Sequence, residues 1–588
     1  MIGTASQAGF DPSAVELPPA IHELIRRVVR RTRLWASERR DLRAELESHF
    51  REGFVELSRE GLSPQQCAAR LEEDFGNPEL AARLIRRGKK RGRSMLWKTM
   101  TASGLSILVL AGAGGSYLAA VAIGRPQPTV DYVEKINEPI RRVPAEDRSW
   151  PILRDVILEF QPPVTQGEEI LAQMPRPGEP LWPEAAAWVS TNRQLVPRLT
   201  EAASRPVDGF IYDNEQTLEF QRRLVLHKEG EAAAQELMAQ ASANGDADLI
   251  PPTISILLPH LTELRTIAKY LVLDSRQSLM RGDFSSAWQS LDSAHRLGIQ
   301  LYESWTLIEQ LVGRAISAQA MQEMRQVLYA RRDQLTAGDL AMIRASLANV
   351  PPLSTIGKRC EGERLFFLDV VQYLFTDDGN GNGRMIPSQF VRLRELVLRA
   401  PGDEAGAMSQ AGGLAMAAVH ADRRDTVAKY FELWDEAMEK LSLPLYDARR
   451  ADAYSSLTAL QEDATASRRF AVIAVVLPDL LRADTQQRTS SMAHEAMRTI
   501  AALEQHRLDH GAYPDRLGAL VPACIAEAPT DAYSGVYLRY ELDASGDFRL
   551  YSVGENLVDD GGSTAPLPAT ASSRPVPRDL VYWPAPVD

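Results

Sequence analysis

The stretch Met95–Gly124 reads MLWKTMTASGLSILVLAGAGGSYLAAVAIG and determines how the rest of the chain is organised. No charged residue occurs at the 26 positions between Lys98 and Arg125. As a helix with a rise of 1.5 Å per residue, such a segment is roughly 39 Å long, enough to cross a hydrocarbon core of about 30 Å with some tilt. We therefore predict one transmembrane helix over residues 95–124.

Basic residues lie on the N-terminal side of this segment, in the run RRGKKRGR at residues 86–93. Because cationic loops remain in the cytoplasm, we expect the N-terminus inside and residues 125–588 outside. A secretory signal peptide would begin near residue 1 and have a shorter apolar region, so that interpretation is less favoured. Small residues four apart in the segment fit a homodimer through this helix, although Gly and Ala are common in membrane helices anyway.

The composition is that of an ordinary folded protein, with 45% apolar and 24% charged residues. A net charge of −12 argues against nucleic-acid binding by the whole chain. Three cysteines are too few for a disulfide framework, and the sequence leaves open whether Cys360 and Cys524 pair. Low cysteine content with many Arg and Ala residues suggests a bacterium. We therefore expect a bacterial inner-membrane protein with a periplasmic body.

The N-terminal part consists of a flexible lead over residues 1–19 and a cytoplasmic helical domain over residues 20–94. Apolar residues three and four apart form one helix face, at Leu42, Leu46, Phe50, Phe54 and Leu57. Ser63 caps the next helix, Pro64 lies in its first turn, and Gly76-Asn77-Pro78 separates it from a last short helix.

This arrangement resembles the HAAS or permease-prefix domain, a small helical domain that precedes transmembrane segments in bacteria. The residues that carry the resemblance are SERRDLRAELESHF and EGLSPQQCAARLEEDFGNPELAARLI. The resemblance implies a signalling or adaptor module without catalytic activity.

Residues 125–184 form a Pro-rich neck and connector, and residues 185–481 form a body with helical periodicity throughout. The clearest unit is Leu264–Leu301, in which the first helix ends at Arg281-Gly282 and Asp283 caps the second. This unit resembles a tetratricopeptide-type hairpin, and we expect another hairpin within residues 304–328. The apolar run at residues 468–481 predicts a buried helix, too short to be a second span.

A calcium-loop pattern, D-x-N-x-N-G, begins at Asp378. Its twelfth position is Gln389, where a calcium loop requires a bidentate Glu. A Gly/Asn turn without metal is therefore the favoured interpretation.

Residues 482–588 predict a small α+β module. A helix ends at Gly511, and the alternating runs VYLRYEL and FRLYSV are joined by DASGD, which is typical of a β-hairpin. The whole chain is thus predicted to be mainly α, with a cytoplasmic helical bundle, one transmembrane helix, a helical-hairpin body and this module.

The module resembles the globular head of the type II secretion major pseudopilin, through LEQHRLDHGAYP, LGALVP, the turn around Asp531, YSVG, DDGG and DLVYW. In that family a loop near the end binds calcium, and by position the implied ligands here are Asp559, Asp560 and Asp579. The inserted run STAPLPATASSRPVPR separates the first two from the third. The leader and apolar helix of a pseudopilin do not precede Ala493, so we expect a borrowed fold and no filament subunit.

No catalytic residues are predicted. His494-Glu495 begins an H-E-x-x-H pattern, but Arg498 occupies the second His position. We expect a membrane-anchored scaffold or sensor that binds protein partners, with a secretion machinery as one candidate partner. The alternatives are an extracytoplasmic enzyme of unrecognised type and a pseudopilus-like component of type II secretion.

Overall fold

The computed structural model describes residues 17–32, 36–59, 62–91, 124–163, 167–243, 250–256, 258–350, 360–398, 408–477, 480–565 and 578–585. The chain divides into two compact units, one holding the N-terminal helices and the other holding the described residues from 124 onward. The predicted transmembrane segment lies outside the described residues except for Gly124. Among the helices in the described ranges, none is long and apolar enough to cross a membrane.

The N-terminal unit consists of α1 (Pro19–Thr32), α2 (Ala36–Arg59), α3 (Pro64–Phe75) and α4 (Pro78–Arg91). Its core contains the predicted apolar face of α2, with Leu42, Leu46, Phe50 and Phe54 buried. Ser63 caps α3 in a reciprocal capping box with Gln66, as its position predicted.

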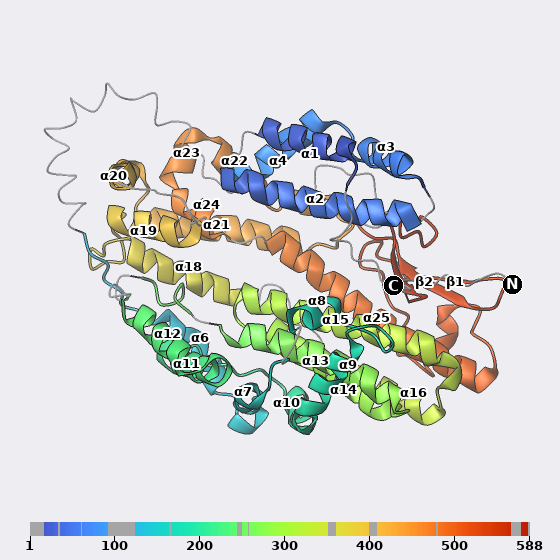
Figure 1. The fold of residues 1–588 in the computed structure, drawn as a ribbon. Helices are drawn as coiled ribbons and strands as arrows, with labels where there is room; N and C mark the ends of the chain where they lie inside the picture. Colours follow the sequence, from blue (N-terminus) through green and yellow to red (C-terminus); the bar gives the residue numbers. More distant parts are fainter. Residues whose placement is uncertain are drawn as a thin grey trace, which may run out of the picture. The chain divides into compact units, whose positions relative to one another are not determined.

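The second unit begins with a run of short helices, which are α6 (Tyr132–Arg141), α7 (Trp150–Glu159), α8 (Gly167–Gln173), α9 (Trp182–Asn192), α10 (Val196–Ser204), α11 (Asn214–Glu229) and α12 (Glu231–Ala243). Three long helices follow, α13 (His260–Met280), α14 (Phe284–Tyr302) and α15 (Leu307–Arg331). The remaining helices are α16 (Ala337–Ala348), α18 (Glu361–Leu374), α19 (Pro387–Leu398), α20 (Met408–Val419), α21 (Arg423–Ser442), α22 (Ser455–Glu462), α23 (Ala464–Arg469), α24 (Ala471–Val476) and α25 (Leu480–His510). The prediction of a mainly α fold is confirmed for the described residues (Figure 1).

The hairpin predicted over residues 264–301 is confirmed by α13 and α14. Asp283 caps α14 by accepting a hydrogen bond from the Ser286 backbone N–H at 3.0 Å. The second hairpin, predicted within residues 304–328, is wrong, because residues 307–328 lie in the single helix α15 and Thr306 is its N-cap. Its Gly313 makes no turn, but allows α15 to lie directly against Gly298 of α14.

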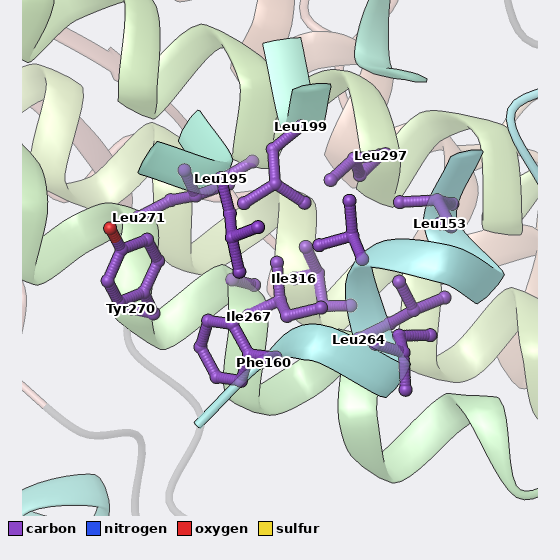
Figure 2. Packing of buried hydrophobic residues seen from close by; sticks show 14 of the residues in the cluster. Leu153, Phe160, Leu195, Leu199, Leu264, Ile267, Tyr270, Leu271, Leu297 and Ile316 are labelled. Carbon is purple, nitrogen blue, oxygen red and sulfur yellow. The ribbon is translucent and has the colours of Figure 1, made fainter. Parts of the chain in front are cut away.

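The core around α13 is built from side chains of α7, α9, α10, α14 and α15 that converge on one apolar cluster (Figure 2). Leu264, Ile267 and Leu271 of α13 are all buried there. The ring of Tyr270 packs edge-on against Phe160, while its hydroxyl donates to the Val189 carbonyl at 3.3 Å. This cluster fixes the short N-terminal helices of the unit onto the long central ones.

The predicted C-terminal hairpin is confirmed by β1 (Arg539–Leu542) and β2 (Phe548–Ser552), which pair in antiparallel register. A third strand, β3 (Leu580–Trp583), pairs antiparallel with β2. The inner face of this sheet packs on α25, and both share one apolar core with α13 to α16, including Trp288, Met324 and Trp583. The α+β module and the helical body therefore form a single packed structure.

The apolar run at residues 468–481 differs from the single buried helix that was predicted. It contains the end of α23, the short α24 and the first residues of α25. Ala471, Val472, Ile473 and Leu480 are nevertheless buried, as expected. Cys360 is buried and Cys524 partly buried, and both are free thiols.

Candidate ligand-binding cavity

A cavity of about 540 Å³ lies in the second unit beside the neck, the segment that follows the predicted span. It has three walls. The first is formed by the neck and α6, the second by the residues around the start of α11, and the third by α18 together with Pro252. The lining residues are Pro128, Thr129, Val130, Asp131, Tyr132, Val133, Glu134, Asn137, Arg141, Tyr212, Asp213, Asn214, Pro252, Asp369, Gln372 and Tyr373.

Gln372 of α18 holds the neck in place. Its Oε1 accepts hydrogen bonds from the backbone N–H groups of Thr129 at 3.2 Å and Val130 at 3.3 Å. Its Nε2 donates to the Val130 carbonyl at 2.8 Å. One side chain thus satisfies three backbone groups of an extended segment that has no strand partner of its own.

Asp369, one turn before Gln372 on α18, holds the cavity wall that contains Pro252. Its Oδ2 accepts from the N–H and the hydroxyl of Thr253 at 2.9 and 2.7 Å, and its Oδ1 accepts from Gln372 Nε2 at 2.8 Å. Burial raises the pKa of the Asp369 carboxyl, although these hydrogen bonds act to lower it. The wall is therefore a buried polar network in which both carboxylate oxygens have donors.

Asn137 of α6 ties the second wall to the first. Its side chain donates to the carbonyl of Tyr212 and accepts from the N–H of the same residue, each at 2.8 Å. The hydroxyl of Tyr212 then donates to Glu309 Oε2 of α15 at 2.6 Å. Tyr212 thus connects the cavity wall with the buried interior.

The lining carries more negative than positive charge, with the carboxylates of Asp131, Glu134, Asp213 and Asp369 against the guanidinium of Arg141. The two aspartates at positions 131 and 213 cap α6 and α11. Glu134 forms an ion pair with Arg141. Since the chain itself supplies a donor to each of these carboxylates, the lining is preorganised before any ligand enters.

The cavity lining contains no His, Cys, Ser or Lys. Its hydroxyl groups are those of Thr129 and three tyrosines, and its four carboxylates already accept hydrogen bonds or ion pairs from the chain. The arrangement suits reversible, non-covalent binding of a polar molecule or segment.

The three aspartates implied as calcium ligands do come together near β2 and β3. Asp579 is fully buried, and its Oδ2 accepts from the N–H groups of Gly562 at 2.7 Å and Ser563 at 3.1 Å. Asp560 accepts from Asn556 Nδ2 at 2.7 Å and Arg578 Nη1 at 3.0 Å.

Asp559 accepts from Arg539 Nε at 2.7 Å and from the Tyr551 hydroxyl at 2.9 Å. Burial acts to raise the pKa of Asp559, but these hydrogen bonds lower it overall. Arginine and backbone donors thus already serve the three carboxylates. Among the residues that the structure describes, no three His, Cys, Asp or Glu side chains are arranged to hold a metal ion. Calcium at this loop stays a prediction.

The D-x-N-x-N-G segment forms a turn whose side chains serve the backbone. Asp378 Oδ1 accepts from the N–H groups of Asn380 at 2.8 Å and Asn382 at 3.1 Å. The Asn382 side chain reaches Asp422 and the backbone N–H of Arg424 at the start of α21. The turn lies between α18 and α19 in the chain, and these hydrogen bonds join it to the start of α21.

Sequence reasoning missed the cavity entirely. The helix-capping roles of Asp131 and Asp213 are readable from the local pattern, because each precedes a helical run. No local signal indicates that Gln372 contacts Val130, since 242 positions separate them.

No family model, curated protein or solved structure matches this chain. The resemblances to the HAAS domain, the tetratricopeptide hairpin and the pseudopilin head therefore stay predictions from the sequence.

Proposed function

We propose that the chain is a single-pass membrane protein whose outer body senses a ligand or protein partner at the neck cavity. The N-terminal helical unit lies in the cytoplasm in this proposal, and the segment 95–124 connects the two. The uncharged 26-residue stretch and the basic run before it support the topology.

The observation that carries the sensing role is the contact of Gln372 with Thr129 and Val130. These two residues form part of the cavity wall and follow the proposed span directly. A molecule that binds in the cavity therefore touches the segment that enters the membrane. A ligand that binds one arrangement of the neck more tightly favours that arrangement by at most its difference in binding free energy between the two arrangements.

Topology is tested first with reporter fusions after residues 94 and 130. We expect an export-dependent reporter to be active only at the second position. Activity of that reporter after residue 94 would rule out a cytoplasmic N-terminal unit.

Sensing is tested by releasing the neck with Gln372→Ala. Gln300→Ala is the matched control, because Gln300 is also a buried glutamine whose Nε2 donates to backbone carbonyls, those of Ala202 and Arg205. Partners of the N-terminal unit are captured by crosslinking in native membranes and identified by mass spectrometry. We expect Gln372→Ala to change the captured set and the control to leave it as in wild type.

Identical partners for wild type and both variants would contradict sensing and leave a scaffold role. Recovery of secretion or pilus proteins through the C-terminal module would instead favour the pseudopilus-like alternative.

A further inference from the structure

Three ionisable side chains lie together in the interior of the second unit, on three different elements. Asp208 belongs to the segment between α10 and α11, His260 begins α13, and Glu309 lies in the first turn of α15. Asp208 is 5% exposed, and the other two are 0% exposed. Bulk water therefore does not reach His260 and Glu309, and Asp208 is almost entirely closed to it.

Several polar atoms of this cluster have no hydrogen-bond partner. These are both ring nitrogens of His260, Oδ1 of Asp208 and Oε1 of Glu309. His260 Nε2 lies 3.7 Å from Glu309 Oε1, too far for a hydrogen bond. The other oxygens are satisfied, since Asp208 Oδ2 accepts from the Phe210 N–H at 3.0 Å, and Glu309 Oε2 accepts from Tyr212 and Thr306.

Among the described side chains, no Lys or Arg places its charged group on the cluster. The rings of Trp150 and Phe210 flank His260, with centroids at 5.3 and 4.0 Å. Arg148 lies against Gly209, but its guanidinium donates to the carbonyls of Val143 and Arg141.

Two further acids near the cluster have partners of their own. Glu263, one turn further along α13, is paired with Lys228 of α11. Glu363 of α18 accepts from the Leu307 N–H at 2.9 Å.

The charge balance of the cluster is therefore uneven. Two ionised carboxylates and one imidazolium sum to one negative charge, and a neutral imidazole leaves two. Buried charge without a partner is costly, so a form with one more proton is favoured as the pH falls. With either form of the imidazole, neutrality of the cluster requires at least one further proton.

We propose that the Asp208–His260–Glu309 cluster takes up a proton on mild acidification and thereby tightens the segment 207–214 that forms one wall of the neck cavity. The segment is well placed for this coupling. The Asp208 carbonyl accepts from the Trp150 N–H at 2.8 Å at one end, while Tyr212 to Asn214 line the cavity at the other. The inference is independent of the proposed sensing role.

The direction of the effect follows from the titration of Asp208. Burial raises the pKa of this carboxyl from 3.8 to about 6, with His260 lowering it and Glu309 raising it. We compare the arrangement in which Asp208 is buried with one in which it is exposed to water. An acid whose pKa is higher in the buried arrangement favours that arrangement at low pH. This preference is lost as the pH rises through about 6.

The test is hydrogen exchange of the full chain in detergent, measured by mass spectrometry and corrected for the intrinsic rates. Between about pH 5 and about pH 7.5 we expect protection of residues 207–214 to fall about tenfold in wild type. The fall arises because the pKa of Asp208 is about two units higher when the carboxyl is buried than when it is exposed. Asp208→Asn keeps the shape and removes the titration, so its protection is expected to be independent of pH.

Asp292→Asn is the control, because burial also raises the pKa of Asp292, on α14. This variant is expected to keep the tenfold fall. Wild-type protection that does not change with pH overturns the proposal, even if Asp208→Asn fails to fold. A fall in Asp208→Asn equal to that of wild type overturns it as well.

Discussion

The crossing of α14 and α15 depends on two glycines, and Gly313→Ala tests how tightly it is packed. A Cβ atom at Gly313 would lie 2.5 Å from the Gly298 carbonyl oxygen and 2.5 Å from the Tyr302 nitrogen. Both neighbours are backbone atoms, so no side chain can rotate away. The two helices must separate, and the core around Leu301 and Ile316 must repack with them.

The magnitude follows from two opposing effects. Replacing Gly by Ala within a helix stabilises by roughly 0.5–1 kcal/mol when the site is open. Overpacking a close helix contact costs about 1–3 kcal/mol, and the upper part of that range applies where backbone must move. We expect a net loss of about 2 kcal/mol for Gly313→Ala. Gly412→Ala, within α20, meets nothing within 4 Å and is the control, with an expected gain of up to about 1 kcal/mol.

The assay is urea unfolding of the full chain in detergent, followed by tryptophan fluorescence. Seven of the nine tryptophans lie in the second unit, so this signal reports mainly on the unit that contains the crossing. A Gly313→Ala midpoint equal to wild type would refute the packing argument. Equal destabilisation by Gly412→Ala would refute it too, because the loss would then come from removing any helical glycine.

The remaining predictions concern buried charge, pH and calcium. Glu323→Gln is expected to lower the free energy of unfolding by about 3 kcal/mol in the same assay, because it leaves the buried Arg276 guanidinium without its bidentate carboxylate partner. Glu495→Gln is the control, because Glu495 is in an exposed ion pair, and its free energy of unfolding should stay within about 0.5 kcal/mol of wild type. Burial lowers the pKa of His295 to about 3 in the folded protein, against about 6.5 in the unfolded chain. As the pH falls below about 6.5, the unfolded chain binds this proton and the folded protein does not, so the free energy of unfolding falls by roughly 1.4 kcal/mol per pH unit. His295→Gln should flatten the acid side of the pH–stability profile, and an unchanged profile would contradict this assignment. If the aspartate loop binds calcium, the unfolding temperature rises in calcium relative to chelator, and Asp579→Asn abolishes the rise; no difference in wild type contradicts the calcium prediction.

The elements predicted correctly from the sequence are those specified by local signals. The Ser63 cap, the Asp283 cap and the turn between β1 and β2 each depend on residues within a few positions of one another. The hairpin expected within residues 304–328 was wrong, and Gly313 in that stretch shows why: a helical glycine has two uses, a chain turn and a close approach between helices. Only the partner helix distinguishes them, and that partner comes from the preceding part of the chain.

The cavity and the buried cluster were not predictable for a related reason. Gln372 is an unremarkable residue in a helical pattern, and Asp208, His260 and Glu309 lie on separate elements. Each group is explained only by what it faces in three dimensions. A lone buried histidine is in addition usually a core residue, so its sequence context raises no expectation of function.

The placement of these groups bears on the choice between a binding protein and an enzyme. Catalysis by acid or base requires a titratable group that reaches the substrate. In the described structure the carboxylates that line the cavity already accept hydrogen bonds or ion pairs from the chain. Buried atoms without partners include those of Asp208, His260 and Glu309, and the hydroxyl of Tyr212 joins the cavity wall to Glu309. A group that cannot touch a ligand can still respond to it through the wall they share. The sensing role that we propose uses this separation, because a ligand would contact the cavity wall while the titratable groups lie in the interior.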